Sequence, residues 1–185
     1  MDCIYHYESP LGGITLAGDG SALTGLWFDG QAHFAESLSA SCEDRMLPVF
    51  TEAEHWLDRY FSGRIPDFTP ALNPRGTPFR RLVWKYLLTV PYGETVTYDE
   101  IADRLSAQTG RRISARAVGG AVGHNAIALI IPCHRVVGAE GRLTGYAGGL
   151  ERKSWLLALE QRAAPICPSS SAAFGMPSTS THSTP

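Results

Sequence analysis

A thiol, an imidazole and a guanidinium follow one another at Cys133, His134 and Arg135, directly after the apolar run AIALIIP of residues 126–132. A cysteine acts as a nucleophile only as its thiolate, so a reactive cysteine needs neighbours that stabilise the negative charge or remove the proton. His134 is the obvious base. Pro132 favours a sharp turn, in which the side chains of Cys133 and His134 can face one site instead of opposite faces of a strand.

The alternative for Cys133 is a small buried hydrophobic residue, which is common for a lone cysteine after an apolar run. The polar residues that follow it weigh against that alternative. A general base also needs a partner that orients it, often a carboxylate. The nearest carboxylates downstream are Glu140, Glu151 and Glu160. Glu160 borders the apolar face of a predicted helix, yet from the sequence alone an exposed terminal glutamate is the more ordinary explanation for it.

The first part of the chain has the pattern of a small sheet covered by one helix. Strands are expected over residues 3–9, 14–18 and 22–28, separated by PLGG and DGS turns. Residues 30–46 are ambiguous. Apolar positions from Val49 to Phe61 have helical spacing, and Gly63 can end the helix. We expect an N-terminal α/β domain over residues 1–65 and, because four prolines punctuate it, an extended linker over 66–78.

The second part is predicted to be mostly helical, over residues 79–162. One helix starts near Phe79, a second begins at the capping box of Thr97 and Glu100, and a third is capped by Ser114. In the third helix Ala117, Val118, Ala121 and Val122 should point inward. Helix, turn and helix in this order outline a helix-turn-helix or winged-helix module, although an ordinary bundle has the same outline.

The remaining segments frame the cysteine. We expect residues 126–132 to form a buried strand that leads to Cys133, and a last helix with Trp155, Leu156 and Leu159 on one face to end at Glu160. Residues 163–185 carry no Asp, Glu, Lys or Arg and are rich in Ser, Thr, Ala and Pro, so a disordered tail is predicted.

Charge divides the chain unevenly although the formal net charge is only -2. Residues 1–70 hold 3 Lys/Arg against 11 Asp/Glu, whereas residues 71–162 hold 13 against 7. A polyanion such as DNA should therefore bind the second part. The four cysteines lie far apart, which fits free thiols better than a disulfide framework. Neither a signal peptide nor a membrane-spanning apolar run is apparent, so we expect a cytoplasmic protein without a membrane partner.

The motif PCHRV of residues 132–136 is specific when its surroundings are included. RAVGGAV precedes it and begins at Arg116, Asn125 follows that segment, and GYAGGLERKSWLLALE follows the motif. This arrangement resembles the O6-alkylguanine-DNA alkyltransferases, over about residues 1–162 and most strongly from Phe79 onward. The resemblance implies a ribonuclease H-like first domain, a helix-turn-helix catalytic domain, and irreversible transfer of an alkyl group from guanine O6 to the protein, with thymine O4 as a second candidate donor.

The resemblance also implies roles for single residues. Cys133 corresponds to the alkyl acceptor, His134 to its water-linked base and Glu160 to the carboxylate behind the base. Asn125 corresponds to a side chain that braces the active-site turn, and Tyr98 to a phenol that assists the departing guanine. Without the resemblance Tyr98 would be taken for a core tyrosine near a helix cap, and Lys153 occupies a position from which a cation could hold the final helix.

A base stacked in duplex DNA cannot reach a pocketed thiol, so the family resemblance implies base flipping. Arg116 corresponds to an arginine that enters the base stack from the minor groove, on a helix whose small residues allow close approach. The backbone near Val136 and the ring of Tyr146 correspond to walls of the guanine pocket. The resemblance also implies contact with DNA for four small residues of the helix that carries Arg116, namely Ala115, Ala117, Gly119 and Gly120.

Some residues depart from the family pattern. Ala126 follows Asn125 where proline is usual, Ala147 replaces a frequent serine, and Arg111 and Arg112 in a longer connection could add phosphate contacts. Cys3 and His6 are too few for a metal site, and no cofactor is expected. The partner is then alkylated double-stranded DNA, bound by a monomer. Two other functions stay open: a lesion-binding protein without chemistry, and a Cys/His acyl-transfer or peroxide-reducing enzyme.

Overall fold

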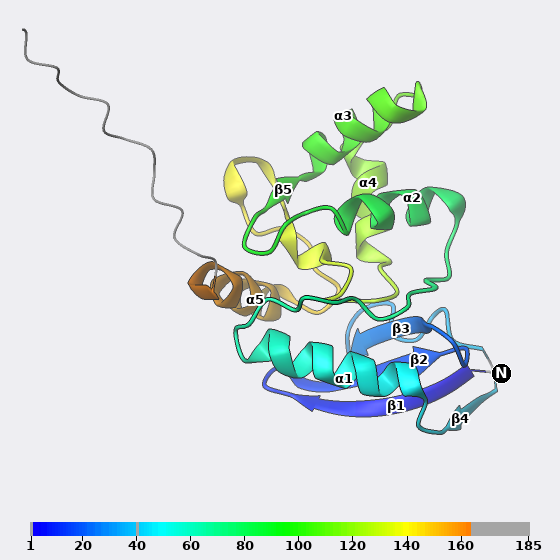
Figure 1. Cartoon of the computed structure of the whole chain (residues 1–185). Helices are drawn as coiled ribbons and strands as arrows, with labels where there is room; N and C mark the ends of the chain where they lie inside the picture. Colours follow the sequence, from blue (N-terminus) through cyan, green and yellow to red (C-terminus); the bar gives the residue numbers. More distant parts are fainter. Residues whose placement is uncertain (1, 40, 164–185) are drawn as a thin grey trace, which may run out of the picture.

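The computed structural model describes residues 2–39 and 41–163, and its first part is a sheet with one helix packed against it (Figure 1). The strands pair in the order β3-β2-β1-β4, with β1 antiparallel to β2, β2 antiparallel to β3, and β1 parallel to β4. The elements are β1 (Asp2–Ser9), β2 (Gly12–Gly18), β3 (Leu23–Phe28), β4 (Cys42–Asp44) and α1 (Pro48–Phe61). The three longer strands and the helix were predicted, whereas β4 lies in the segment that the sequence left ambiguous.

The second part is helical and carries a two-stranded parallel sheet. Thr97 accepts a hydrogen bond from the backbone N–H of Glu100, whose side chain accepts one from Thr97 N–H, so the predicted capping box is confirmed. Ser114 caps the next helix, also as predicted. The elements are α2 (Pro78–Leu87), β5 (Val96–Thr97), α3 (Tyr98–Thr109), α4 (Ala115–Gly123), η1 (Cys133–Arg135), β6 (Val136–Val137), η2 (Ala139–Gly141) and α5 (Leu150–Ala163).

The segment 126–132 is buried, but the prediction that it forms a strand is wrong. It makes one bridge to the sheet, between Ile127 and Leu26, and then turns at Leu129, whose φ is +65°. The side chain of Asn125 explains the turn. Its amide binds the backbone of the segment at Ile127 and Ile131, so these polar groups are paired without a strand ladder.

Two smaller expectations also need correction. Helix α5 does not end at Glu160 but continues to Ala163, because Gln161 and Arg162 are good helix formers and the sequence holds no glycine or proline there. Ala117 is exposed, since only Val118, Ala121 and Val122 on α4 face the core. The predicted tail lies outside the described residues from 164 onward.

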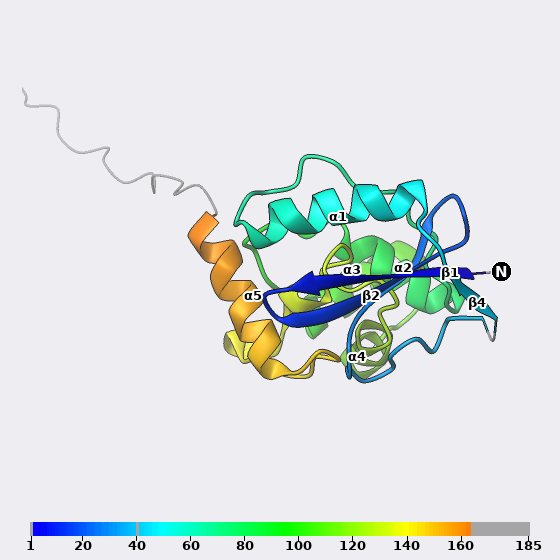
Figure 2. The same ribbon diagram turned by 90° about the horizontal axis from the view of Figure 1, so that it is seen from below.

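Helix α5 joins the two parts of the molecule. The side chain of Arg152 donates to the carbonyl of Leu11 in the β1–β2 turn, and Trp155 contacts Phe61 at the end of α1. Figure 2 shows α5 crossing beside this end of the sheet and α1. Residues of α5 are therefore held in register with the first part of the chain. Within the described residues, no helix is both long and apolar enough to cross a membrane.

Candidate active site

Cys133 begins a 3-10 turn and lies in the interior, where 4% of its surface is exposed. Its Sγ accepts a hydrogen bond from Asn125 Nδ2 at 3.0 Å. Burial raises the pKa of the Cys133 thiol, although the Asn125 amide and the positive charge of Lys153 act in the opposite direction. The resting thiol is therefore protonated at neutral pH, and a base has to remove its proton before it can act as a nucleophile.

Asn125 holds the turn that carries Cys133. Its Nδ2 also donates to the carbonyls of Ile131 at 2.8 Å and Ile127 at 3.2 Å, while its Oδ1 accepts from Ile127 N–H at 3.1 Å. One amide thus ties both ends of the turn to the sulfur. The structure therefore brings Asn125 and Cys133 together, as the sequence predicts.

His134 is completely buried, and its Nε2 lies 2.6 Å from Glu160 Oε1. Burial lowers the pKa of the imidazole despite the opposing effect of the carboxylate. A neutral ring facing a carboxylate carries its proton on Nε2, which fixes the tautomer and leaves the lone pair on Nδ1. Nδ1 is buried and has no hydrogen-bond partner among the described residues. This nitrogen is consequently free to accept a proton.

Glu160 is also fully buried, which rules out the alternative of an exposed terminal glutamate. Burial by itself would raise the pKa of this carboxyl, but His134 and Arg135 outweigh it and lower the pKa to about 2. Arg135 donates through Nε at 2.9 Å and Nη2 at 3.0 Å, one bond to each oxygen. Gly93 N–H adds a bond at 3.0 Å and Tyr60 O–H another at 2.7 Å. A buried carboxylate this well satisfied stays ionised.

Tyr60 and Arg135 are the residues of this cluster whose roles the sequence does not reveal. Tyr60 comes from α1, and its hydroxyl lies 3.2 Å from His134 Nε2 as well as next to Glu160. Arg135 also donates to the carbonyl of Val90 at 2.7 Å, so it holds the carboxylate instead of facing solvent. Helical spacing placed Tyr60 in the core, but no pattern in the sequence connects it to a histidine 74 residues away.

Lys153 is buried and binds backbone carbonyls of the segment that follows Cys133 in the chain. Its Nζ donates to Val136 at 2.5 Å, Thr144 at 2.7 Å and Gly145 at 3.4 Å. Burial lowers the pKa of this ammonium to about 8, which leaves it charged at neutral pH. As the sequence predicts, the cation holds α5 in place, here against the loop after β6.

A cavity of about 240 Å³ lies between this loop and α4. Tyr98 and Tyr146 form part of its wall, and the Tyr98 hydroxyl lies 3.5 Å from the Thr144 carbonyl. Burial raises the pKa of Tyr98, so its hydroxyl is a proton donor at neutral pH. Val136 is completely buried and is not among the residues that line this cavity. The lining consists of Ala32, His33, Tyr98, Gly119, Val122, Gly123, Gly145, Tyr146 and Ala147.

Helix α4 presents small residues next to this cavity. Arg116, Ala117 and Gly120 are exposed, whereas Ala115 and Gly119 are partly buried. A Cβ added to Gly119 would meet the ring of Tyr98 at 3.8 Å, so the helix passes close to the cavity wall. Arg116 lies in the first turn of α4, and the other residues of this helix are Ala, Gly and Val.

Two family models match the chain. The DNA-binding domain of 6-O-methylguanine DNA methyltransferase matches residues 78–162, and the ribonuclease-like domain of the same family matches residues 4–74. The chain belongs to this family. The two family models together cover both parts of the fold of this methyltransferase. The expected α+β class, with a sheet domain followed by a helical domain, is confirmed.

Several relatives are similar over nearly the whole methyltransferase. The methylated-DNA–protein-cysteine methyltransferase of Mycobacterium tuberculosis is 48% identical over 166 residues, which cover 86% of this chain and 94% of the relative. The protein of that name from Methanosarcina barkeri is 46% identical, with 83% of this chain and 94% of the relative covered. The crystal structure of Mycobacterium tuberculosis OGT in complex with DNA has a TM-score of 0.76 and 47% identity, and covers 89% of this chain and 96% of that one.

Proposed function

We propose that this methyltransferase repairs DNA by moving a methyl or larger alkyl group from O6 of guanine to Sγ of its own Cys133, once per molecule. One observation carries the proposal. A buried thiol is bound to Asn125 and is followed in the chain by an imidazole whose free nitrogen is Nδ1, while a carboxylate occupies the other nitrogen. This is the arrangement required by a thiol that is protonated at rest and loses its proton only for reaction.

The proton leaves the thiol through His134. In our proposal a water molecule carries it from Sγ to Nδ1, and the ring becomes an imidazolium. Glu160 is ionised and 2.6 Å from Nε2, so it stabilises the new positive charge. Arg135 and Tyr60 keep this carboxylate in position. The Asn125 amide and the ammonium of Lys153 stabilise the thiolate that forms.

The thiolate then attacks the alkyl carbon in line with the carbon–oxygen bond. A carbon–sulfur bond forms, the bond to guanine O6 breaks, and its electron pair goes to the guanine. Guanine would leave as an anion, and the Tyr98 hydroxyl at the cavity wall can donate a proton or a hydrogen bond to it. The product on Cys133 is a thioether. Because the Cys133 thiolate is a poor leaving group from a saturated carbon, the carbon–sulfur bond persists and each molecule acts once.

The guanine must leave the helix to reach Cys133. We infer that it is flipped into the cavity lined by Tyr98 and Tyr146, with α4 in the minor groove. Arg116 is exposed in the first turn of α4 and would fill the gap left in the base stack. The small residues of α4, Ala115, Ala117, Gly119 and Gly120, allow the helix to approach the sugar–phosphate backbone closely. Because the side chain of Val136 does not line the cavity, Val136 would contact the guanine through its backbone.

The proposal is tested by the intact mass of the protein after mixing with a duplex that contains one O6-methylguanine. We expect a gain of one methyl group per molecule, located on Cys133 by peptide mapping, and no further gain with excess DNA. The Cys133→Ser variant should gain nothing, whereas Cys42→Ser, which removes an exposed thiol, should react normally. Binding to the alkylated duplex without any mass gain would contradict the proposal, as would a methyl group on another residue.

A further inference from the structure

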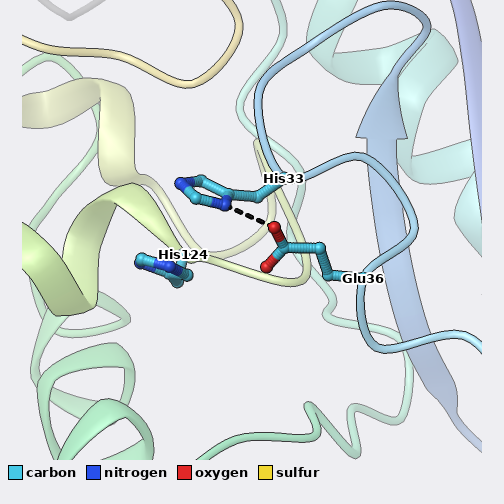
Figure 3. A group of neighbouring side chains, drawn as sticks. All are labelled: His33, Glu36 and His124. Atoms are coloured by element: carbon cyan, nitrogen blue, oxygen red, sulfur yellow. Dashed lines mark hydrogen bonds and ion pairs between the residues drawn. The ribbon is translucent and has the colours of Figure 1, made fainter.

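Two histidines and a glutamate converge next to the cavity without belonging to the acceptor site (Figure 3). His33 and Glu36 lie in the loop after β3, and His124 follows α4 directly as its C-terminal cap. One possible ligand atom from each residue lies within 4.8 Å of the other two. No pattern in the sequence indicates a metal site here, because His124 is far from His33 and Glu36 along the chain.

The hydrogen bonds of the cluster leave ligand atoms available. His124 Nδ1 lies 2.7 Å from the carbonyl of Gly120, so this nitrogen carries the proton and Nε2 keeps its lone pair. A histidine whose other nitrogen is held by a backbone carbonyl is the usual arrangement of a metal ligand. His33 Nδ1 is 2.7 Å from Glu36 Oε1. An ion between these two groups would replace this contact and take up both the nitrogen and the carboxylate.

The local backbone favours this convergence. His33 has a φ of +59°, a conformation that non-glycine residues adopt uncommonly. The loop is fixed before His33, where Gln31 accepts from Phe28 N–H and Ala32 N–H donates to the carbonyl of Ala147, and again after it, where Ser39 N–H donates to Asp2 Oδ2. The rings of His33 and His124 lie face to face, with centroids 3.8 Å apart. A held loop thus keeps the two rings close together, and the rings have to rotate before both can face one ion.

We propose that His33, Glu36 and His124 form a binding site for one divalent ion of the zinc class. Two imidazoles and one carboxylate are a ligand set that suits zinc, and water would complete the coordination. Ligands around zinc lie roughly 3.3 Å apart when each is about 2 Å from the metal. The separation of up to 4.8 Å closes by rotation of the three side chains, which are at least partly exposed. Arg75 and Arg80 line the same hollow and oppose a cation, so binding should be moderate.

The ion would act on the wall of the base cavity. His33 lines that cavity of about 240 Å³ and also the hollow of about 270 Å³ that holds Glu36 and His124. An ion shared by His33 and His124 ties the loop after β3 to the end of α4, and thereby restrains one side of the entrance for the base. This consequence rests on the proposed function of the cavity, whereas binding of the ion does not.

The test is titration of the metal-free full chain with Zn²⁺, followed by calorimetry. We expect one ion per molecule. His33→Ala, Glu36→Gln and His124→Ala should each weaken binding at least about tenfold, since loss even of a ligand's hydrogen-bond partner typically costs about 10- to 100-fold. His55→Ala, an exposed histidine on α1, is the matched control and should bind normally.

Co²⁺ as a second probe separates this site from the thiols. Binding at the cluster gives a spectrum without sulfur-to-metal charge transfer, and Cys133→Ser and Cys42→Ser should leave it unchanged. The proposal is overturned if Zn²⁺ does not bind, or if the three cluster variants bind as tightly as His55→Ala does. Hydrogen exchange of residues 29–39 gives the last readout, and it should slow with Zn²⁺ in the parent chain but not in His124→Ala. Loss of alkyl transfer with intact zinc binding would count against the proposed function alone.

Discussion

The charge on Glu160 should be worth about a hundredfold in the rate of alkyl transfer, and Glu160→Gln tests this. Burial opposes ionisation of the carboxyl, yet His134 and Arg135 bring its pKa from 4.5 down to about 2. The difference corresponds to a preference for the ionised form of about 3 kcal/mol. If the ionised carboxylate stabilises the imidazolium that forms during reaction by a similar amount, removal of the negative charge lowers the rate roughly 100-fold.

The assay is a single-turnover measurement with excess protein and a duplex carrying one O6-methylguanine, with DNA affinity measured separately by fluorescence anisotropy. Glutamine keeps an acceptor for His134 but removes the charge, so affinity should change little while the rate falls. The matched control is Glu151→Gln, an exposed glutamate in the first turn of the same helix. Tyr60→Phe keeps the charge and removes one of its donors, and should cost less than about tenfold.

The refuting result is a Glu160→Gln rate within about twofold of the parent rate in a variant with native circular dichroism. Glu160 would then anchor Arg135 without taking part in proton transfer. An equal fall in rate and in DNA affinity would also contradict the reasoning, because it would indicate a general disturbance of the fold. Since Arg135 is buried, folding of the variant has to be checked before its rate is interpreted.

Three further predictions follow from the same contacts. Arg116→Ala should slow repair of duplex DNA much more than reaction with free O6-methylguanine, because only the duplex needs a filler in its stack; equal losses would contradict this role. Lys153→Met should lower the free energy of unfolding in urea by about 3 kcal/mol, because buried carbonyls lose their donor, and the exposed Lys85→Met should change it little. The stability that Glu160 adds is present above its unfolded pKa and is lost as pH falls from about 4.5 towards about 2, so Glu160→Gln, unlike Glu151→Gln, should flatten urea stability in this range.

The sequence predicted those parts of the molecule whose cause is local. The capping box at Thr97, the cap at Ser114 and the three longer strands β1, β2 and β3 depend on residues a few positions apart, and the structure confirms them. The turn after Asn125 was missed because an apolar run has the same composition in a strand and in a buried turn. Only the amide of Asn125, which binds backbone groups on both sides, distinguishes the two.

The site was predictable in part, for a similar reason. Cys133 and His134 are neighbours in the chain, and Asn125 and Glu160 could be added through the family resemblance. Tyr60 had no such signal, because it reaches the cluster from a helix 100 residues before Glu160. Packing of α1 against the helical part is what makes it a partner of the carboxylate. Helix α1 of the first domain thus covers the sheet and also supplies the Tyr60 hydroxyl to the proposed proton path.

Burial of Cys133, His134 and Glu160 protects an acceptor thiol that is used once. An exposed thiolate would react with any oxidant or alkylating agent, and each such event would consume a molecule. Here burial raises the pKa of the Cys133 thiol and keeps His134 neutral, so the nucleophile is scarce at rest. In the proposed path the thiol proton goes to the buried imidazole of His134, which the ionised Glu160 holds in place. In the proposed mechanism, reactivity therefore appears only when a base in the cavity brings its alkyl carbon to the sulfur.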